Sequence, residues 1–136
     1  MKVTDLLAEF WGGFTDVEGK LIPAYKSGYA FTKDDKNRPI PAPFPYITYE
    51  VVQPNFSSNA PTTVNIWDKR HAPGDFTVVN HILEQVEEKI PTEGLLLPGD
   101  LWLKRNSANF IFYMDDPHDQ LITRGVVNLM LQNFIL

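Results

Sequence analysis

The first segment with helical spacing lies at the start of the chain. Apolar residues between Val3 and Phe14 fall on one face of a helix, and two consecutive glycines, Gly12 and Gly13, end the pattern. We therefore predict an N-terminal helix over residues 3–13.

A second segment shows the same spacing over a longer stretch. Asp75 can cap a helix at this point, and Pro91 forbids its continuation. Its apolar residues recur every three or four positions, so they form one stripe, which should be buried. The stripe comprises Phe76, Val79, Leu83, Val86 and Ile90.

Alternating apolar and polar positions predict strands. The first two, residues 46–53 and 62–68, should pair as antiparallel neighbours. Three more extended segments follow the central helix: 95–104, which Pro98-Gly99 interrupts, then 109–114 and 121–134. The last of them also fits a helix, but Gly125 and the pair Val126-Val127 favour a strand. Residues 115–120 should form the hairpin loop before it.

Residues 15–45 show no periodicity. Turn-forming residues alternate with isolated aromatics, and prolines stand at 39, 41, 43 and 45. We interpret the segment as an irregular loop or short hairpin with an extended end. The prolines could form a polyproline ligand for an aromatic groove, although a stiff lead-in to the next strand is the favoured reading.

This order of elements predicts an α+β fold. The helices and strands are segregated and their links are hairpin-length, so the sheet should be mostly antiparallel. We expect four to five strands, with the central amphipathic helix and the N-terminal helix packed on them. The chain shows no internal repeat, and residues 1–136 should form a single domain whose sheet-and-helix core is 46–134.

Composition narrows the possible functions. The chain has 136 residues, of which 43% are hydrophobic, a formal net charge of −5 and no cysteine. These values predict a folded soluble protein without disulfides, thiolate metal sites or a cysteine nucleophile. The acidic balance argues against electrostatic binding to DNA or to anionic lipid. Neither a signal peptide nor a membrane span is expected.

Two polar clusters could carry chemistry. Asp115, Asp116, His118 and Asp119 offer oxygen and imidazole ligands, but their spacing matches no calcium loop and is typical of a hairpin turn. The acidic residues of the central helix lie away from its apolar stripe, which indicates a solvated face or a partner surface. They are Glu84, Glu87 and Glu88. We therefore predict no catalytic residue, no cofactor and no metal.

The chain ends on three apolar residues, where termini are usually polar. These are Phe134, Ile135 and Leu136. Burial in the core of the same subunit and burial against a neighbouring subunit explain them equally well.

Several stretches together resemble the tail terminator, or tail completion, proteins of long-tailed bacteriophages. The resemblance covers roughly residues 43–134 and rests on PFPYITYEVVQPNF, TTVNIWDK, the helix DFTVVNHILEQVEEKI, and the pair LWLKRNSANFIFYMDD and LITRGVVNLMLQNF. Within them, the matching positions are Pro45, Tyr46 and Ile47 in a proline-led strand, Trp67 and Asp68 in a Trp-Asp turn, the acidic Asp115-Asp116, and Arg124 with Asn128.

The resemblance implies a structural virion protein rather than an enzyme. Such a subunit is expected to form a hexameric ring at the head-proximal end of the tail after assembly in the host cytoplasm. Its partners would be other copies of itself, the major tail tube protein and a head completion protein, with DNA passing through unbound. The alternatives are a head-side connector or other small virion adaptor, and a small metal-dependent enzyme that uses residues 115–119.

Overall fold

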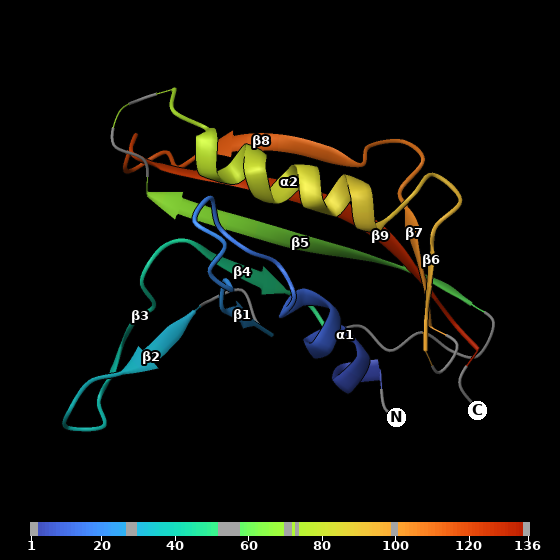
Figure 1. Cartoon of the computed structure of the whole chain (residues 1–136), viewed down its shortest axis with the longest axis horizontal. Helices are drawn as coiled ribbons and strands as arrows, with labels where there is room; N and C mark the ends of the chain where they lie inside the picture. The colour runs from blue at the N-terminus through green and yellow to red at the C-terminus, as the bar shows by residue number, and fades with distance from the viewer. Residues whose placement is uncertain are drawn as a thin grey trace.

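The computed structural model describes residues 3–26, 30–51, 58–69, 72, 74–98 and 101–134. Within these ranges the chain forms a curved, mostly antiparallel sheet with helices on one side and a small hairpin that projects from the body (Figure 1). The expected α+β class is confirmed. The predicted strand count of four to five is wrong, because the main sheet has seven strands.

Both expected helices are present. They are α1 (Val3–Trp11) and α2 (Thr77–Lys89). Asp75 lies one residue before the N-cap position of α2, and its carboxylate accepts hydrogen bonds from the Thr77 amide at 3.1 Å and the Thr77 hydroxyl at 2.7 Å. The stripe of α2 is buried as predicted, with two differences. Ile82 joins it at 0% exposure, whereas Phe76 is only half-buried.

The extra strands come from short segments that lack a clear pattern. The strands of the main sheet are β1 (Ala24–Tyr25), β4 (Tyr46–Tyr49), β5 (Asn59–Lys69), β6 (Leu95–Leu97), β7 (Leu101–Arg105), β8 (Ile111–Asp115) and β9 (Ile122–Asn133). The two-residue strand β1 is too short for alternation to reveal. The expected extended segment 95–104, with its interruption at Pro98-Gly99, consists of two strands, β6 and β7, which pair antiparallel with each other.

Residues 15–45 are more ordered than the predicted irregular loop. Besides β1, they contain β2 (Phe31–Lys33) and β3 (Pro39–Pro41), which pair only with each other. The short-hairpin alternative is therefore the correct one. We call residues 31–41 the β2–β3 arm, because Figure 1 shows this hairpin extending away from the sheet and both helices.

The two longest strands form the centre of the sheet. β5 and β9 pair along eleven positions, from Asn59 opposite Gln132 to Lys69 opposite Ile122. The other edge of β9 is shared by β7 and β8. Arg105 at the end of β7 pairs with Leu129, and Ile111 at the start of β8 pairs with Val127. The chain therefore advances six residues from β7 to β8 while β9 advances only two. The surplus residues bulge out of the ladder.

Alternation along β5 and β9 gives the sheet two different faces. The closed face packs on the helices and includes Val64, Ile66, Val127, Leu129 and Leu131, each at most 1% exposed. Gly125 lies on this face beneath α2. A Cβ at Gly125 would lie 2.9 Å from both Val79 Cγ1 and Leu83 Cδ1, so glycine is what allows the helix to approach this closely.

The opposite face carries the intervening residues, and no helix of the described ranges covers it; we call it the open face. Trp67 lies on this face, and Asp68, only 7% exposed, lies on the closed face. Both belong to β5, which continues to Lys69. The expected Trp-Asp turn is therefore wrong, since the strand extends through these residues.

Candidate functional site on the open face of the sheet

A row of three side chains crosses the open face where β4, β5 and β9 lie side by side. The register places Tyr46 opposite Trp67, and Trp67 opposite Arg124. The Tyr46 and Trp67 rings stack with centroids 6.2 Å apart, and the Arg124 guanidinium carbon lies 5.1 Å from the Trp67 ring centroid. Three residues from distant parts of the sequence thus form one contact cluster.

One partly buried hydrogen bond and ring packing fix the rings of this row. The Trp67 indole Nε1 donates to the hydroxyl of Thr48, which is 1% exposed, at 2.9 Å. Phe44 stacks on Tyr46 at 5.1 Å, and Tyr25 meets it edge-on at 6.1 Å. Burial, helped by nearby Tyr25, raises the pKa of the Tyr46 phenol above its ordinary value, so Tyr46 is neutral at physiological pH.

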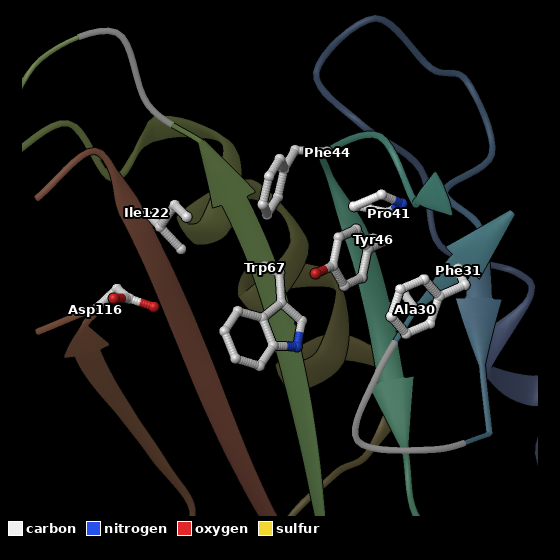
Figure 2. A pocket seen from close by; sticks show the side chains of 8 residues that line it. All are labelled: Ala30, Phe31, Pro41, Phe44, Tyr46, Trp67, Asp116 and Ile122. Atoms are coloured by element: carbon white, nitrogen blue, oxygen red, sulfur yellow. The ribbon is translucent and has the colours of Figure 1, made fainter. Parts of the chain in front are cut away.

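These rings line a hollow of about 270 Å³, which we call the aromatic trough. Its lining residues are Ala30, Phe31, Pro41, Phe44, Tyr46, Trp67, Asp116 and Ile122 (Figure 2). In Figure 2 the Phe31 ring approaches Tyr46 from the arm side, and Asp116 lies at the opposite end, beyond Ile122. The trough therefore runs across the strands, from the β2–β3 arm to the β8–β9 loop.

A second hollow of about 250 Å³ adjoins the trough and shares Trp67, Asp116 and Ile122 with it. Arg124 and Asp115 belong to this neighbour. The Arg124 guanidinium is held there by the Trp67 ring and by a contact of 3.2 Å with Met114 Sδ. Arg124 thus covers the β9 side of Trp67 and does not line the trough itself.

The acidic 115–119 loop is a hydrogen-bonded turn. Asp116 Oδ1 accepts the His118 amide at 2.7 Å and the Asp119 amide at 3.2 Å, and Asp119 Oδ1 accepts the Leu121 amide at 2.9 Å. Asp119 also lies 3.8 Å from Lys69 Nζ. Over the described ranges, no group of three or more His, Asp or Glu side chains is placed to hold a metal ion. The carboxylates shape the loop, and Asp116 faces the trough.

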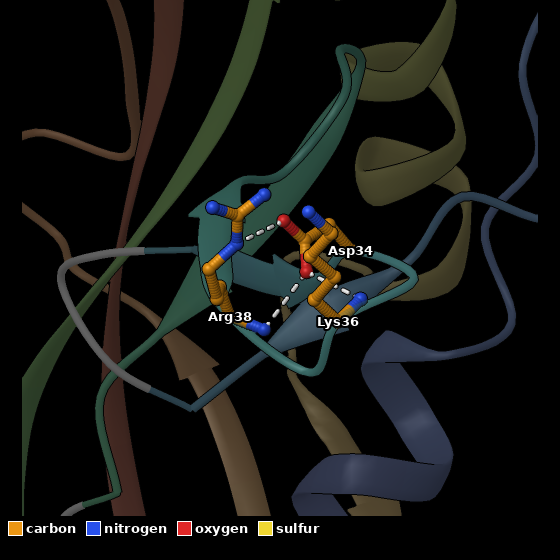
Figure 3. A network of polar contacts seen from close by, with 3 residues as sticks. All are labelled: Asp34, Lys36 and Arg38. Carbon is orange, nitrogen blue, oxygen red and sulfur yellow. Dashed lines mark hydrogen bonds and ion pairs between the residues drawn. The ribbon is translucent and has the colours of Figure 1, made fainter.

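The β2–β3 arm owes its order to its two ends. At its tip, Asp34 Oδ1 accepts the Lys36 and Arg38 amides, both at 2.9 Å, and Asp34 Oδ2 receives Arg38 Nε at 2.8 Å (Figure 3). At its base, the Ala42 amide donates to the Ala30 carbonyl at 3.0 Å. The two strands of the arm pack on little else. Isolated two-stranded hairpins are only marginally stable, so the contacts at the tip and base are what hold this hairpin together.

The other predicted interface residues lie away from the trough. Glu84, Glu87 and Glu88 are exposed on the outer side of α2, as expected. Burial raises the pKa of Tyr113, and the charges of Glu87 and Glu84 add to that rise, so the negative field of α2 reaches β8. Phe134 is half-buried beside Trp102 in a separate hollow, while Ile135 and Leu136 lie outside the described residues.

The quoted family positions are only partly brought together. Tyr46, Trp67 and Arg124 meet, and Asp116 lies at the end of the trough that Tyr46 and Trp67 line. Asn128 instead accepts a hydrogen bond from Thr63 at 3.3 Å. Sequence reasoning missed Phe31 and Phe44, because they belong to a segment without periodicity. The sequence does contain one indication of the site: Tyr46 and Trp67 are large aromatic residues at positions where the alternation predicts the polar face of a strand.

Comparisons with family models, with curated proteins and with solved structures find no match for this chain. Within the described ranges, no helix is long and apolar enough to cross a membrane.

Proposed function

We propose that this chain is a structural subunit of a bacteriophage tail, similar to the tail terminators. In this role, copies of the chain form a ring that caps the tail tube, stops further addition of the tail tube protein and offers the surface to which the head joins. The proposal rests on the sequence resemblance and on one feature of the fold.

That feature is the contact cluster of Tyr46, Trp67 and Arg124 on the open face. These three residues are among the positions that carry the resemblance, and the fold brings them into direct contact on a face that no helix of the described ranges covers. An ordered, half-buried cluster of aromatic and arginine side chains at the surface has the composition of a protein-binding centre. Its position supports a protein that acts by docking to other proteins.

A terminator needs several contact surfaces, and the chain offers distinct candidates. The aromatic trough and the β2–β3 arm lie at one end of the sheet, and the carboxylates of α2 lie on its closed side. If Glu84, Glu87 and Glu88 line the channel of a ring, their charge keeps DNA from adhering as it passes.

Electron microscopy of lysates from a phage lacking this gene tests the proposal. We expect filled heads and separate tails that are overlong or irregular, because nothing blocks addition at the upper end of the tube. Normal-length tails that stay separate from heads would instead favour a joining adaptor. Normal tails attached to heads would exclude both roles.

Complementation with charge-reversed protein separates assembly from folding. The triple variant Glu84→Lys, Glu87→Lys, Glu88→Lys should change the free energy of unfolding by no more than about 0.5 kcal/mol, because all three side chains are exposed. We expect it to restore fewer infectious particles than wild type. Reversal of Glu18, exposed on the turn after α1, is the matched control.

A further inference from the structure

We propose that the aromatic trough binds a cationic side chain, supplied by Lys36 at the tip of the β2–β3 arm of a second copy of the chain. This inference rests on the proposed ring and names the contact that builds it. The occupant is therefore a second subunit, joined tip to trough.

The chemistry of the trough suits a cation. Four of its eight lining residues are aromatic, and their ring faces are electron-rich, so they attract ammonium and guanidinium groups. Asp116 adds a carboxylate at one end, held in place by two backbone amides. The same surface already holds one cation in this way, since Arg124 lies 5.1 Å from the Trp67 ring centroid.

The size of the trough favours a side chain over a small molecule. Its volume of about 270 Å³ lies below the ~300–1,000 Å³ of typical small-molecule pockets. One long side chain with its charged end fits such a space. Because the trough is open along the sheet, the rest of the donor chain can remain outside it.

The β2–β3 arm supplies a cation of matching charge. Lys36 is exposed at the tip of the arm. Among the residues that the structure describes, the ion pair at this tip joins Asp34 to Arg38 and does not include Lys36. Residues 31–41 contain three basic and two acidic side chains, so the arm has a formal charge of +1. Since the whole chain has a net charge of −5, the rest of the chain carries −6. The arm is thus a basic projection on an acidic subunit.

The position of the arm makes the contact intermolecular. Phe31 and Pro41, at the base of the arm, line the trough, while Lys36 lies at the far end of the same hairpin. While its strands stay paired from Phe31–Pro41 to Lys33–Pro39, the hairpin cannot bring its tip to its own base, so the tip of one copy reaches the trough of the next. Such a head-to-tail contact repeats from subunit to subunit and closes into a ring when the rotation allows.

The first experiment measures self-association of the full chain by sedimentation or native mass. We expect Lys36→Gln, Asp116→Asn and Phe31→Leu each to weaken association about 10-fold. Each change is conservative: asparagine keeps an acceptor for the His118 and Asp119 amides, and leucine keeps apolar bulk without the aromatic face. The controls are Lys20→Gln, another exposed lysine, and Tyr113→Leu, an aromatic residue that is 48% exposed outside the trough.

A second experiment uses tetramethylammonium chloride as the probe. At equal ionic strength, it should dissociate the assembly more strongly than sodium chloride, because only the organic cation competes for aromatic faces. The difference between the two salts should be smaller in Phe31→Leu, because one of the four aromatic rings of the trough is then gone. Equal effects of both salts on wild type would show that the contact is not aromatic and would overturn the proposal.

The outcomes separate this inference from the proposed function. If the wild type assembles and none of the three trough and arm variants weakens the assembly, the tip-to-trough contact is wrong, although a ring built by another contact remains possible. A wild type that is monomeric at every concentration would overturn the second copy as occupant. In both cases the lysate experiment still decides the tail role on its own.

Discussion

The two faces of the central sheet differ in what their residues contact. On the closed face, Val64 and Ile66 of β5 are at most 1% exposed and pack in one hydrophobic core with α1 and α2. On the open face, Trp67 of the same strand is half-buried and contacts Tyr46 and Arg124. One strand thus carries stability on one side and a recognition surface on the other, and mutations on the two sides should have separable effects.

The largest loss of stability should come from the closed face. Leu83→Ala should lower the free energy of unfolding by about 2–5 kcal/mol, because the side chain is 2% exposed and its removal leaves a cavity. Urea unfolding measures the change. Leu96→Ala, at a site 57% exposed on β6, is the control and should cost no more than about 0.5 kcal/mol. Equal losses at both sites would remove the distinction between the faces.

The tight approach of α2 to β9 predicts a smaller loss. Gly125→Ala should destabilise by about 1–3 kcal/mol, because the new methyl group overpacks against Val79 and Leu83. In the Leu83→Ala background the same change should cost less, since space has been made. Additive losses in this double-mutant cycle would show that the two sites do not share the contact.

On the open face, Trp67→Phe should cost about 1 kcal/mol. The change removes the indole donor to the buried Thr48 hydroxyl but keeps an aromatic ring beneath Arg124. Adding Thr48→Val should recover part of the loss, because both hydrogen-bonding partners are then gone. Thermal unfolding of the single and double variants checks this, and a further loss in the double variant would contradict it.

The smallest effect is local and depends on pH. Backbone hydrogen bonding from Arg38 is the largest of the contacts that hold the pKa of the Asp34 carboxyl below its ordinary value of 3.8. Because the pKa of Asp34 is lower in the folded arm than in the unfolded chain, the ionised carboxylate stabilises the arm at any pH above the unfolded pKa. This stabilisation is lost as the pH falls through the folded pKa. Amide exchange of Lys36 and Arg38 should therefore accelerate, relative to the core, only in strong acid. Asp34→Ala should accelerate it at neutral pH as well.

The closed face was predictable because burial imposes a period on the sequence. Val79, Leu83 and Val86 repeat at helical spacing, and Val64 and Ile66 alternate as a strand does, since each faces the same core. The number of strands was not predictable. The two residues of β1 are too few to show a period, and the bulge between β7 and β8 depends on their register with β9.

The aromatic trough was beyond sequence reasoning for a different reason. Phe31, Tyr46, Trp67 and Asp116 come from four separate segments, and only strand register and the placement of the β2–β3 arm bring them together. The exposed carboxylates of α2 were correctly placed, because helical periodicity alone decides their side. The acidic loop was correctly interpreted as a turn, since Asp116 and Asp119 bind the neighbouring amides.

The pairing of β5 with β9 also constrains how a newly synthesised chain folds. β5 ends at Lys69, and β9, its long partner, begins at Ile122, after every other strand has been translated. Until β9 emerges from the ribosome, one edge of β5 has no neighbour, β8 has no strand to pair with, and the β6–β7 pair has no strand that joins it to β5. Ladders between such distant segments form slowly, since a long loop must close first. The nascent chain therefore passes through a stage with an open apolar sheet edge, at which chaperones should bind it most strongly.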